Sequence, residues 1–128
     1  MKHKRGREDY LKTIYLLSKK GEVHGVTIAA EMGITRPTVC VAMKMLREEG
    51  YVTMESDYSI HLTELGKKIA VETHDRHMTF KELLISLGVD EDIAIRDACE
   101  LEHSVGPESF LALKSLLEPR REGAVAEG

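Results

Sequence analysis

The chain has 128 residues, of which 42% are hydrophobic and 31% are charged. This balance is typical of one soluble globular domain or two very small ones, and it excludes a largely disordered chain. Its apolar runs are too short for a transmembrane helix, its N-terminus lacks a signal-peptide core, and two cysteines cannot build a disulfide framework. We therefore expect a cytoplasmic protein with no membrane partner.

Charge is divided unevenly along the chain. Residues 1–70 carry 12 Lys and Arg against 9 Asp and Glu, a net +3, whereas residues 71–128 carry 6 against 13, a net −7. A basic first half and an acidic second half indicate two functions, one directed to an anion and one to a cation or a partner. Charge imbalances this small also arise by chance, so the assignment of function depends on the sequence motifs.

The first 70 residues have the pattern of a helix-turn-helix followed by a small hairpin, or wing. Gly33 breaks the pattern between the second and third helices. Thr35 is a suitable N-cap for the third helix, and Pro37 stands where a first-turn proline is tolerated. The expected elements, in chain order, are helices over residues 8–20, 26–32 and 37–49 and strands over residues 51–54 and 59–62.

The second half predicts helices alone. Thr63 is placed to cap a long helix, Gly88 to end it, and Pro119 to end the last helix. The expected helices cover residues 64–87, 91–104 and 108–118. The predicted fold class is therefore mainly α: a winged helix-turn-helix domain over residues 1–70, an all-helical domain over 71–118, and a disordered tail over 119–128.

The third helix has one apolar and one polar face. Val39, Met43 and Leu46 recur at i, i+4 and i+7 and should face the core. The opposite face can contact phosphates and base edges in a major groove. Its candidate DNA-binding residues are Thr35, Arg36, Pro37, Thr38, Val41 and Lys44. The alternative is an ordinary solvated helix face, and a net +3 would bind DNA weakly unless the protein dimerises.

Cys99, Glu102 and His103 stand at i, i+3 and i+4 and therefore share one face of a helix. A thiolate, a carboxylate and an imidazole on one face suit a divalent transition metal. Spacing alone slightly favours the alternative interpretation, a buried cysteine beside an exposed Glu–His pair. His77 can be an exposed histidine, and Asp9 can be an acid in the first turn of the first helix, where it complements the helix dipole.

Taken together, the sequence resembles the diphtheria-toxin-repressor family of metal-dependent transcriptional repressors, which includes iron sensors and manganese regulators. The resemblance runs from about residue 8 to about residue 117, and the segments that carry it are EDYLKTIY (8–15), RPTV (36–39), LTELGKKIA (62–70), RH (76–77), LGVD (87–90) and DACELEH (97–103). It implies a winged-helix domain and a helical metal-binding domain that forms a homodimer. It also implies metal-dependent binding to a palindromic double-stranded DNA operator and repression of metal-uptake genes. Many members carry a third, SH3-like domain, for which this chain is too short.

The resemblance also implies a ligand set. Cys99, Glu102 and His103 match the family's ligands on the dimerisation helix, and Asp9 matches the ligand on the first helix. An Asp at that position is typical of manganese sensors, whereas a Cys at position 99 is typical of iron sensors. The expected cofactor is therefore Mn²⁺ or Fe²⁺, with Co²⁺ and Zn²⁺ able to bind in vitro. His77 matches a histidine that serves a second metal.

Departures from the family pattern argue against a complete second site. Lys12 and Lys81 stand where relatives carry acids, and Ile95 replaces a histidine of the iron sensors. Lysines repel a second cation. We therefore expect one well-formed metal site, with His77 as a weaker fifth candidate for it.

Two other classes of function are compatible with parts of the sequence. A winged-helix regulator could sense redox state through Cys99 and Cys40, although nothing obvious in the sequence activates either thiol. A metalloenzyme would need a catalytic pattern, and the sequence contains no HExxH motif and no Ser–His–Asp arrangement. We expect a protein that is not an enzyme.

Overall fold

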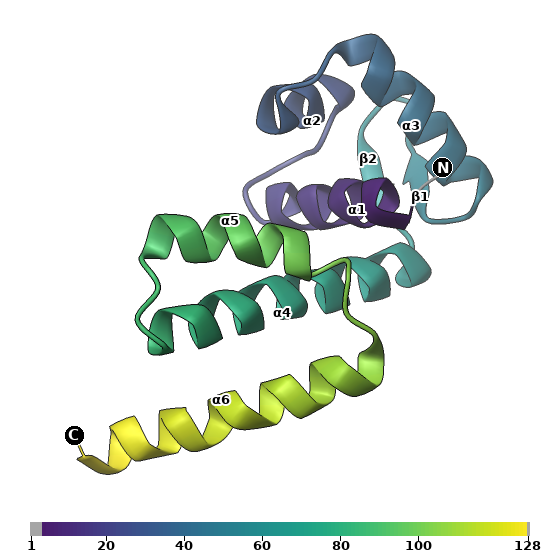
Figure 1. Ribbon diagram of the computed structural model, residues 1–128. Coiled ribbons are helices and arrows are strands. Elements are labelled where there is room, and N and C mark those ends of the chain that lie inside the picture. Colours follow the sequence, from purple (N-terminus) through teal and green to yellow (C-terminus); the bar gives the residue numbers. More distant parts are fainter. Residues whose placement is uncertain (1–3, 128) are drawn as a thin grey trace. The chain divides into compact units, whose positions relative to one another are not determined.

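A computed structural model describes residues 4–127, with side chains over residues 6–117. The described chain is mainly helical, as the sequence predicts (Figure 1). Its elements are α1 (Lys4–Ser18), α2 (Gly25–Met32), α3 (Arg36–Glu48), β1 (Val52–Met54), β2 (Ile60–Leu62), α4 (Glu64–Ser86), α5 (Glu91–Leu101) and α6 (Pro107–Glu127). They form two compact units, Met1–Thr73 and His74–Gly128, and α4 contributes to both.

Local signals set the turn between α2 and α3. Gly33 adopts a left-handed conformation with φ of 67°, which glycine reaches without steric cost, and it ends α2. The Thr35 hydroxyl then accepts a hydrogen bond from the amide of Thr38 at 3.3 Å, and Pro37 lies in the first turn of α3. The predicted N-cap and helix-turn-helix are both confirmed.

The first unit has its own hydrophobic core. Val39, Met43 and Leu46 of α3 are buried, as predicted, against Leu11 and Ile14 of α1. Burying such side chains contributes about 1.5–3 kcal/mol each. Because these residues occupy the inner face of α3, its outer face is left to solvent.

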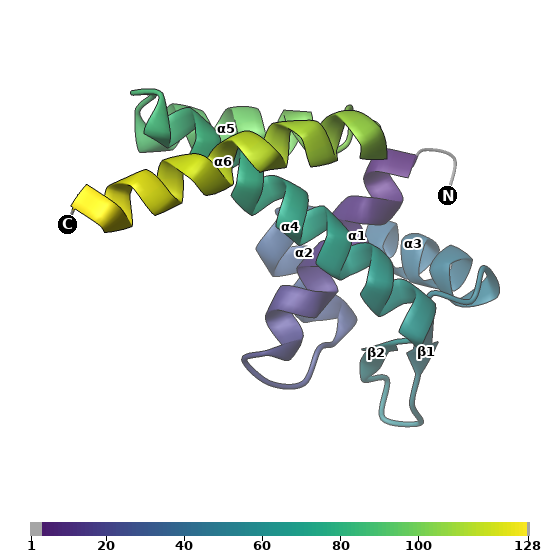
Figure 2. The ribbon, with the colours of Figure 1, turned by 90° about the horizontal axis from the view of Figure 1, so that it is seen from below.

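The wing is a short antiparallel hairpin in which Val52 pairs with Leu62. Figure 2 shows β1 and β2 beside the start of α4. The Thr63 hydroxyl links the two elements, because it donates to the Gly50 carbonyl at 2.8 Å and accepts from the Gly66 amide at 3.1 Å. Thr63 is therefore the cap that the sequence predicts.

We expect Gly66→Ala to destabilise the first unit. A methyl group at this position would overlap the carbonyl oxygen of Tyr51, a backbone atom that cannot move aside. Overpacking of this kind costs about 1–3 kcal/mol, so thermal unfolding followed by circular dichroism should occur several degrees lower. Gly25→Ala is the matched control, since its methyl meets only a Val39 methyl at 3.9 Å. Equal melting temperatures for the two variants would contradict this prediction.

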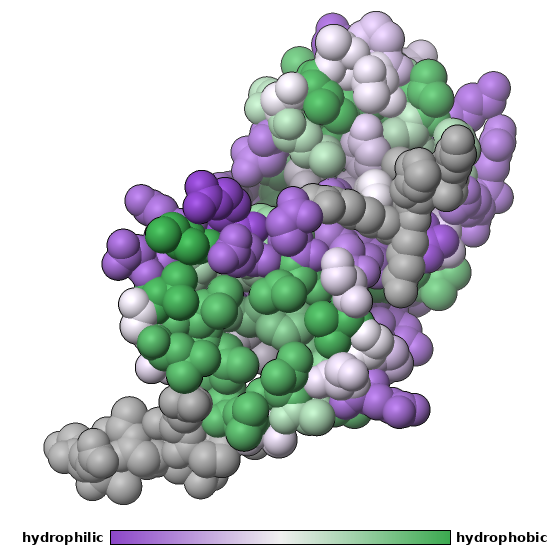
Figure 3. All heavy atoms as spheres, in the orientation of Figure 1, coloured by the Kyte–Doolittle hydropathy of each residue, from purple (hydrophilic) through white to green (hydrophobic). Residues whose placement is uncertain are grey.

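The second unit packs around aromatic residues. Phe80 of α4 and Phe110 of α6 make an edge-to-face contact with ring centroids 5.8 Å apart, and Ala98 of α5 completes the core. Other large apolar side chains of this unit remain exposed, and Figure 3 shows an extensive apolar surface there. They are Ile85, Leu87, Ile93, Leu111 and Leu116. An apolar surface of this kind is typical of a surface that contacts another chain.

The start of α1 differs from the prediction. The helix is already formed at Lys4, because Lys and Arg favour helix. No acidic residue therefore lies in its first turn. The expectation that Asp9 complements the helix dipole there is wrong.

Two further helix ends differ. We expected a helix to residue 104, but α5 ends at Leu101 because the following hydrogen bonds tighten, with the Ser104 amide bonding to the Leu101 carbonyl at 3.0 Å.

We expected the last helix to end before Pro119 and a disordered tail to follow. Instead α6 runs to Glu127, because a proline removes only one backbone donor and the residues after it favour helix. Within the described residues, no helix is both long and apolar enough to cross a membrane.

Candidate metal centre and nucleic-acid interface

The end of α5 presents three potential ligands. Cys99 lies in the last turn of α5, Glu102 is the C-cap, and His103 follows in the turn. Glu102 keeps helical dihedral angles, and its amide bonds to the Ala98 carbonyl at 3.0 Å. The i, i+3, i+4 spacing therefore brings these side chains to one side although the helix ends at Leu101.

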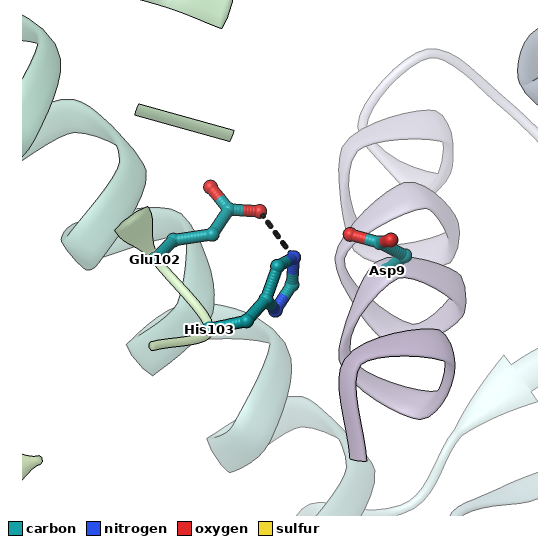
Figure 4. A group of neighbouring side chains, drawn as sticks. All are labelled: Asp9, Glu102 and His103. Carbon is teal, nitrogen blue, oxygen red and sulfur yellow. Dashed lines mark ion pairs between the residues drawn. The ribbon is translucent and has the colours of Figure 1, made fainter. Parts of the chain in front are cut away.

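Glu102 is the centre of this group. Its side chain is fully buried, and the residue is 1% exposed. One carboxylate oxygen lies 3.2 Å from Nε2 of His103, and the other lies 3.0 Å from Nδ1 of His77 on α4 (Figure 4 draws the first pair). A buried carboxylate is costly unless it is paired, so two imidazoles from two different segments meet it.

The thiol of Cys99 lies beside the same imidazole. Its Sγ is 3.8 Å from Nδ1 of His77. Sulfur, nitrogen and oxygen donors thus gather within the second unit, from His77, Cys99, Glu102 and His103. The side chains of the two histidines and Glu102 are at most 15% exposed. The alternative reading, with an exposed Glu–His pair and an exposed His77, is wrong because these side chains are turned inward.

This donor set fits a divalent transition metal. Thiolate and imidazole ligands favour such ions over Mg²⁺ or Ca²⁺, and a buried carboxylate adds negative charge. Asp9, the remaining expected ligand, lies on α1 in the first unit and is half-buried (Figure 4). Ligation by Asp9 stays a prediction.

Arg76 is a further candidate functional residue that we did not predict from the sequence. Its guanidinium donates to the Val105 carbonyl and lies 4.9 Å from the centroid of the Phe110 ring. These contacts hold the turn that follows His103 against α4. Arg76 therefore helps to position His103, a candidate ligand, without contacting it. The only signal in the sequence was its place beside His77 in the RH pair.

All six residues expected to face DNA are exposed on α3 or at its N-terminus: Thr35, Arg36, Pro37, Thr38, Val41 and Lys44. Val41 is 63% exposed and is therefore available for contact with a thymine methyl. The hydroxyls of Thr35 and Thr38 lie 2.8 Å apart and are already hydrogen-bonded to each other.

A groove of about 360 Å³ lies between α3 and the wing. Arg36, Lys44 and Arg47 line it together with Cys40 and Tyr58. Arg47, which we had not predicted, adds a third cation to this face. The surface therefore concentrates positive charge where a helix-turn-helix meets phosphates.

A winged helix with a cationic recognition helix, followed by a helical unit with sulfur, nitrogen and oxygen donors around the buried Glu102, defines a DNA-binding protein with a candidate metal centre. Comparison with known families agrees. Residues 4–59 match the N-terminal DNA-binding domain of the iron-dependent repressors, and residues 63–122 match their metal-binding and dimerisation domain. The chain belongs to this family of DNA-binding transcriptional regulators, which are not enzymes.

Similar proteins include named regulators. The chain is 36% identical over 104 residues to the transcriptional regulator MntR of Salmonella typhimurium, covering 80% of this chain and 66% of that protein. It is 37% identical over 114 residues to an uncharacterised HTH-type transcriptional regulator of Methanocaldococcus jannaschii, covering 87% of this chain and 91% of that protein. The chain thus spans slightly less than two thirds of the Salmonella regulator.

Solved structures share the fold. The manganese regulator SloR superposes with a TM-score of 0.78 at 29% identity, over 88% of this chain and 53% of that one. A manganese-dependent transcriptional repressor in complex with manganese gives a TM-score of 0.80 at 25% identity, over 88% and 52% of the two chains. The present chain matches about half the length of each.

Proposed function

We propose that this protein is a metal-dependent DNA-binding transcriptional repressor of metal-ion homeostasis genes, with Mn²⁺ or Fe²⁺ as co-repressor. The observation that carries the proposal is the buried Glu102 carboxylate between His77 and His103, with the Cys99 thiol beside the His77 imidazole. A winged helix alone accounts for DNA binding but not for this cluster.

His77, Cys99, Glu102 and His103 would hold the ion from the second unit. Asp9 would add a carboxylate from α1, an assignment that rests on the family pattern in the sequence. The ion supplies a strong point charge that organises these ligands. A ligand set drawn from both units would tie the recognition helix to the dimer and raise the population of the DNA-binding state.

The ligand atoms of the proposed centre indicate which metal ions it favours. Related regulators have been solved with manganese, with zinc and with cadmium bound. Asp9 favours Mn²⁺, and Cys99 favours Fe²⁺ over harder ions, with Co²⁺ and Zn²⁺ as substitutes in vitro. The protein would therefore be a hybrid between the manganese-sensing and iron-sensing patterns.

The partner on DNA would be a palindromic operator bound by a homodimer. The exposed apolar side chains of the second unit supply a surface for the second copy, and the matching family domain is described as a dimerisation domain. A twofold dimer places its recognition helices in major grooves about 34 Å apart, which requires a palindromic site. Dimerisation would also double the phosphate contacts of a weakly basic domain.

Cobalt spectroscopy tests the metal centre directly. Because Co²⁺ bound to a thiolate absorbs in the near ultraviolet by sulfur-to-metal charge transfer, the protein should develop this band on titration with Co²⁺. We expect Cys99→Ser to lose the band, while Cys40→Ser, which changes the exposed cysteine on α3, keeps it. A band that survives Cys99→Ser, or is lost with Cys40→Ser, would contradict the proposed centre.

A further inference from the structure

A second group of potential ligands lies in the first unit, away from the family's ligand set. Glu22 and His24 come from the segment between α1 and α2, and Asp57 comes from the wing turn. Each offers one donor atom, and the three atoms lie within 4.8 Å of one another. Two carboxylate oxygens and an imidazole nitrogen thus meet at one place, where the α1–α2 segment faces the wing.

The backbone holds the two segments together at this place. Val23, between the two ligands of the α1–α2 segment, is 3% exposed and anchors that segment in the core. Its carbonyl accepts a hydrogen bond from the Ile60 amide in β2 at 2.8 Å. Glu22 and His24 therefore flank a fixed residue, and their distance from the wing is set by the fold.

The carboxylate of Asp57 is oriented by hydrogen bonds from Ser59. One of its oxygens accepts hydrogen bonds from the Ser59 hydroxyl at 2.7 Å and the Ser59 amide at 3.0 Å. These bonds, the hydroxyl first, keep the pKa of Asp57 below its usual value. Both bonds engage Oδ1 of Asp57, so Oδ2 remains available to coordinate a metal ion.

Two neighbouring carboxylates repel each other unless a cation compensates them. Across the described part of the chain, neither Glu22 nor Asp57 has an ion pair with a lysine or arginine. His24 is the only nitrogen donor of the group, and its amide bonds to the Thr27 hydroxyl at 3.3 Å at the start of α2. An imidazole beside two carboxylates is a ligand set that binds transition metals. A cluster of carboxylates alone would not favour transition metals over Mg²⁺ or Ca²⁺.

We propose that Glu22, His24 and Asp57 form a second divalent transition-metal site, which joins the wing to the segment leading into the helix-turn-helix. Water completes the coordination, because Glu22 and Asp57 are exposed. A bound ion offsets the negative charge beside the wing and cross-links two segments near the DNA-facing helix. This site does not depend on the proposed function, since all its ligands belong to the first unit.

Paramagnetic broadening by Mn²⁺ in amide NMR spectra of the full chain locates the site. We expect Mn²⁺ to broaden the amides of residues 22–24 and 57–59 in the wild-type protein. In the double variant Glu22→Gln, Asp57→Asn this broadening should need at least about tenfold more Mn²⁺. Glu55→Gln is the matched control, because it removes a charge from the same turn and leaves the three ligands in place.

The amides of residues 99–103 report the proposed regulatory centre in the same spectra. If they respond and residues 22–24 and 57–59 do not, even at millimolar Mn²⁺, the second site is overturned and the regulatory centre stands. If the wing amides respond equally in the double variant, the ion is held by other groups and the proposal is also overturned. A wing response that the double variant loses supports the site whatever residues 99–103 do.

Discussion

Glu102→Gln is expected to abolish metal-dependent DNA binding while the fold is retained. Glutamine has the same shape but no negative charge, so the buried centre would lose the carboxylate that lies between His77 and His103. Loss of a direct anionic ligand should weaken metal binding more than the 10- to 100-fold typical of an outer partner, so we expect about 100-fold or more. Fluorescence anisotropy with operator DNA and increasing Mn²⁺ measures the effect.

Glu100→Gln is the matched control for this experiment. Glu100 lies in the last turn of α5, two residues before Glu102, but is exposed, and the substitution removes the same charge. It should leave the midpoint of the Mn²⁺ titration near the wild-type value. A Glu102→Gln protein that responds to Mn²⁺ as the wild type does would show that the regulatory metal is bound elsewhere.

The second large effect is expected from the DNA-facing surface. Arg36→Ala and Lys44→Ala each remove an exposed cation from α3, and each borders the groove between α3 and the wing. Loss of a cation that hydrogen-bonds to a base should cost about 1–3 kcal/mol of binding free energy, or roughly 5- to 150-fold in affinity. Loss of a cation that contacts a phosphate should reduce the slope of log affinity against log salt by about 1. Metal binding should be unchanged in both variants, because all candidate ligands remain.

Salt dependence distinguishes the two roles. Anisotropy titrations at several salt concentrations give the slope, and comparison of operator with unrelated DNA gives specificity. Arg96→Ala removes the same charge from an exposed position of the second unit and serves as the control. If it weakens operator binding as much as Arg36→Ala does, net charge and not the face of α3 determines affinity.

The features of the fold that depend on local chemistry could be predicted from the sequence. The Gly33 turn, the Thr35 cap and the Thr63 cap are each specified by a residue and its near neighbours. The inner face of α3 followed from periodicity, because Val39 and Leu46 are fixed by the helical repeat. Helix ends were less predictable, because weak breakers such as Pro119 do not by themselves end a helix.

The candidate site was only partly predictable, for a different reason. Spacing shows that Cys99, Glu102 and His103 share a face, but it cannot show that Glu102 is buried or that His77 reaches it. That contact joins residues on α4 and at the end of α5, so it depends on how two helices pack. The cluster of Glu22, His24 and Asp57 joins a loop to the wing and left no signal in the sequence for the same reason.

Within the described residues, neither the exposed Cys40 nor the half-buried Cys99 forms a disulfide. A redox sensor would change its DNA affinity on thiol oxidation in the absence of any metal. We expect Cys40→Ser to leave the dependence of DNA binding on metal intact, because this side chain is not one of the candidate metal ligands around Glu102. Loss of the metal response in Cys40→Ser would favour the redox reading.

The most direct test of the account is the affinity of the wild-type protein for a palindromic operator of the family type, measured by fluorescence anisotropy at fixed salt. The titration is made with chelator and then with Mn²⁺, anaerobic Fe²⁺, Co²⁺ or Zn²⁺. We predict tight operator binding only when metal is present. The order of operator affinities among the four ions then indicates which metal acts as co-repressor. Equal binding with and without metal would contradict the account, because the buried cluster would then have a structural role and not a regulatory one.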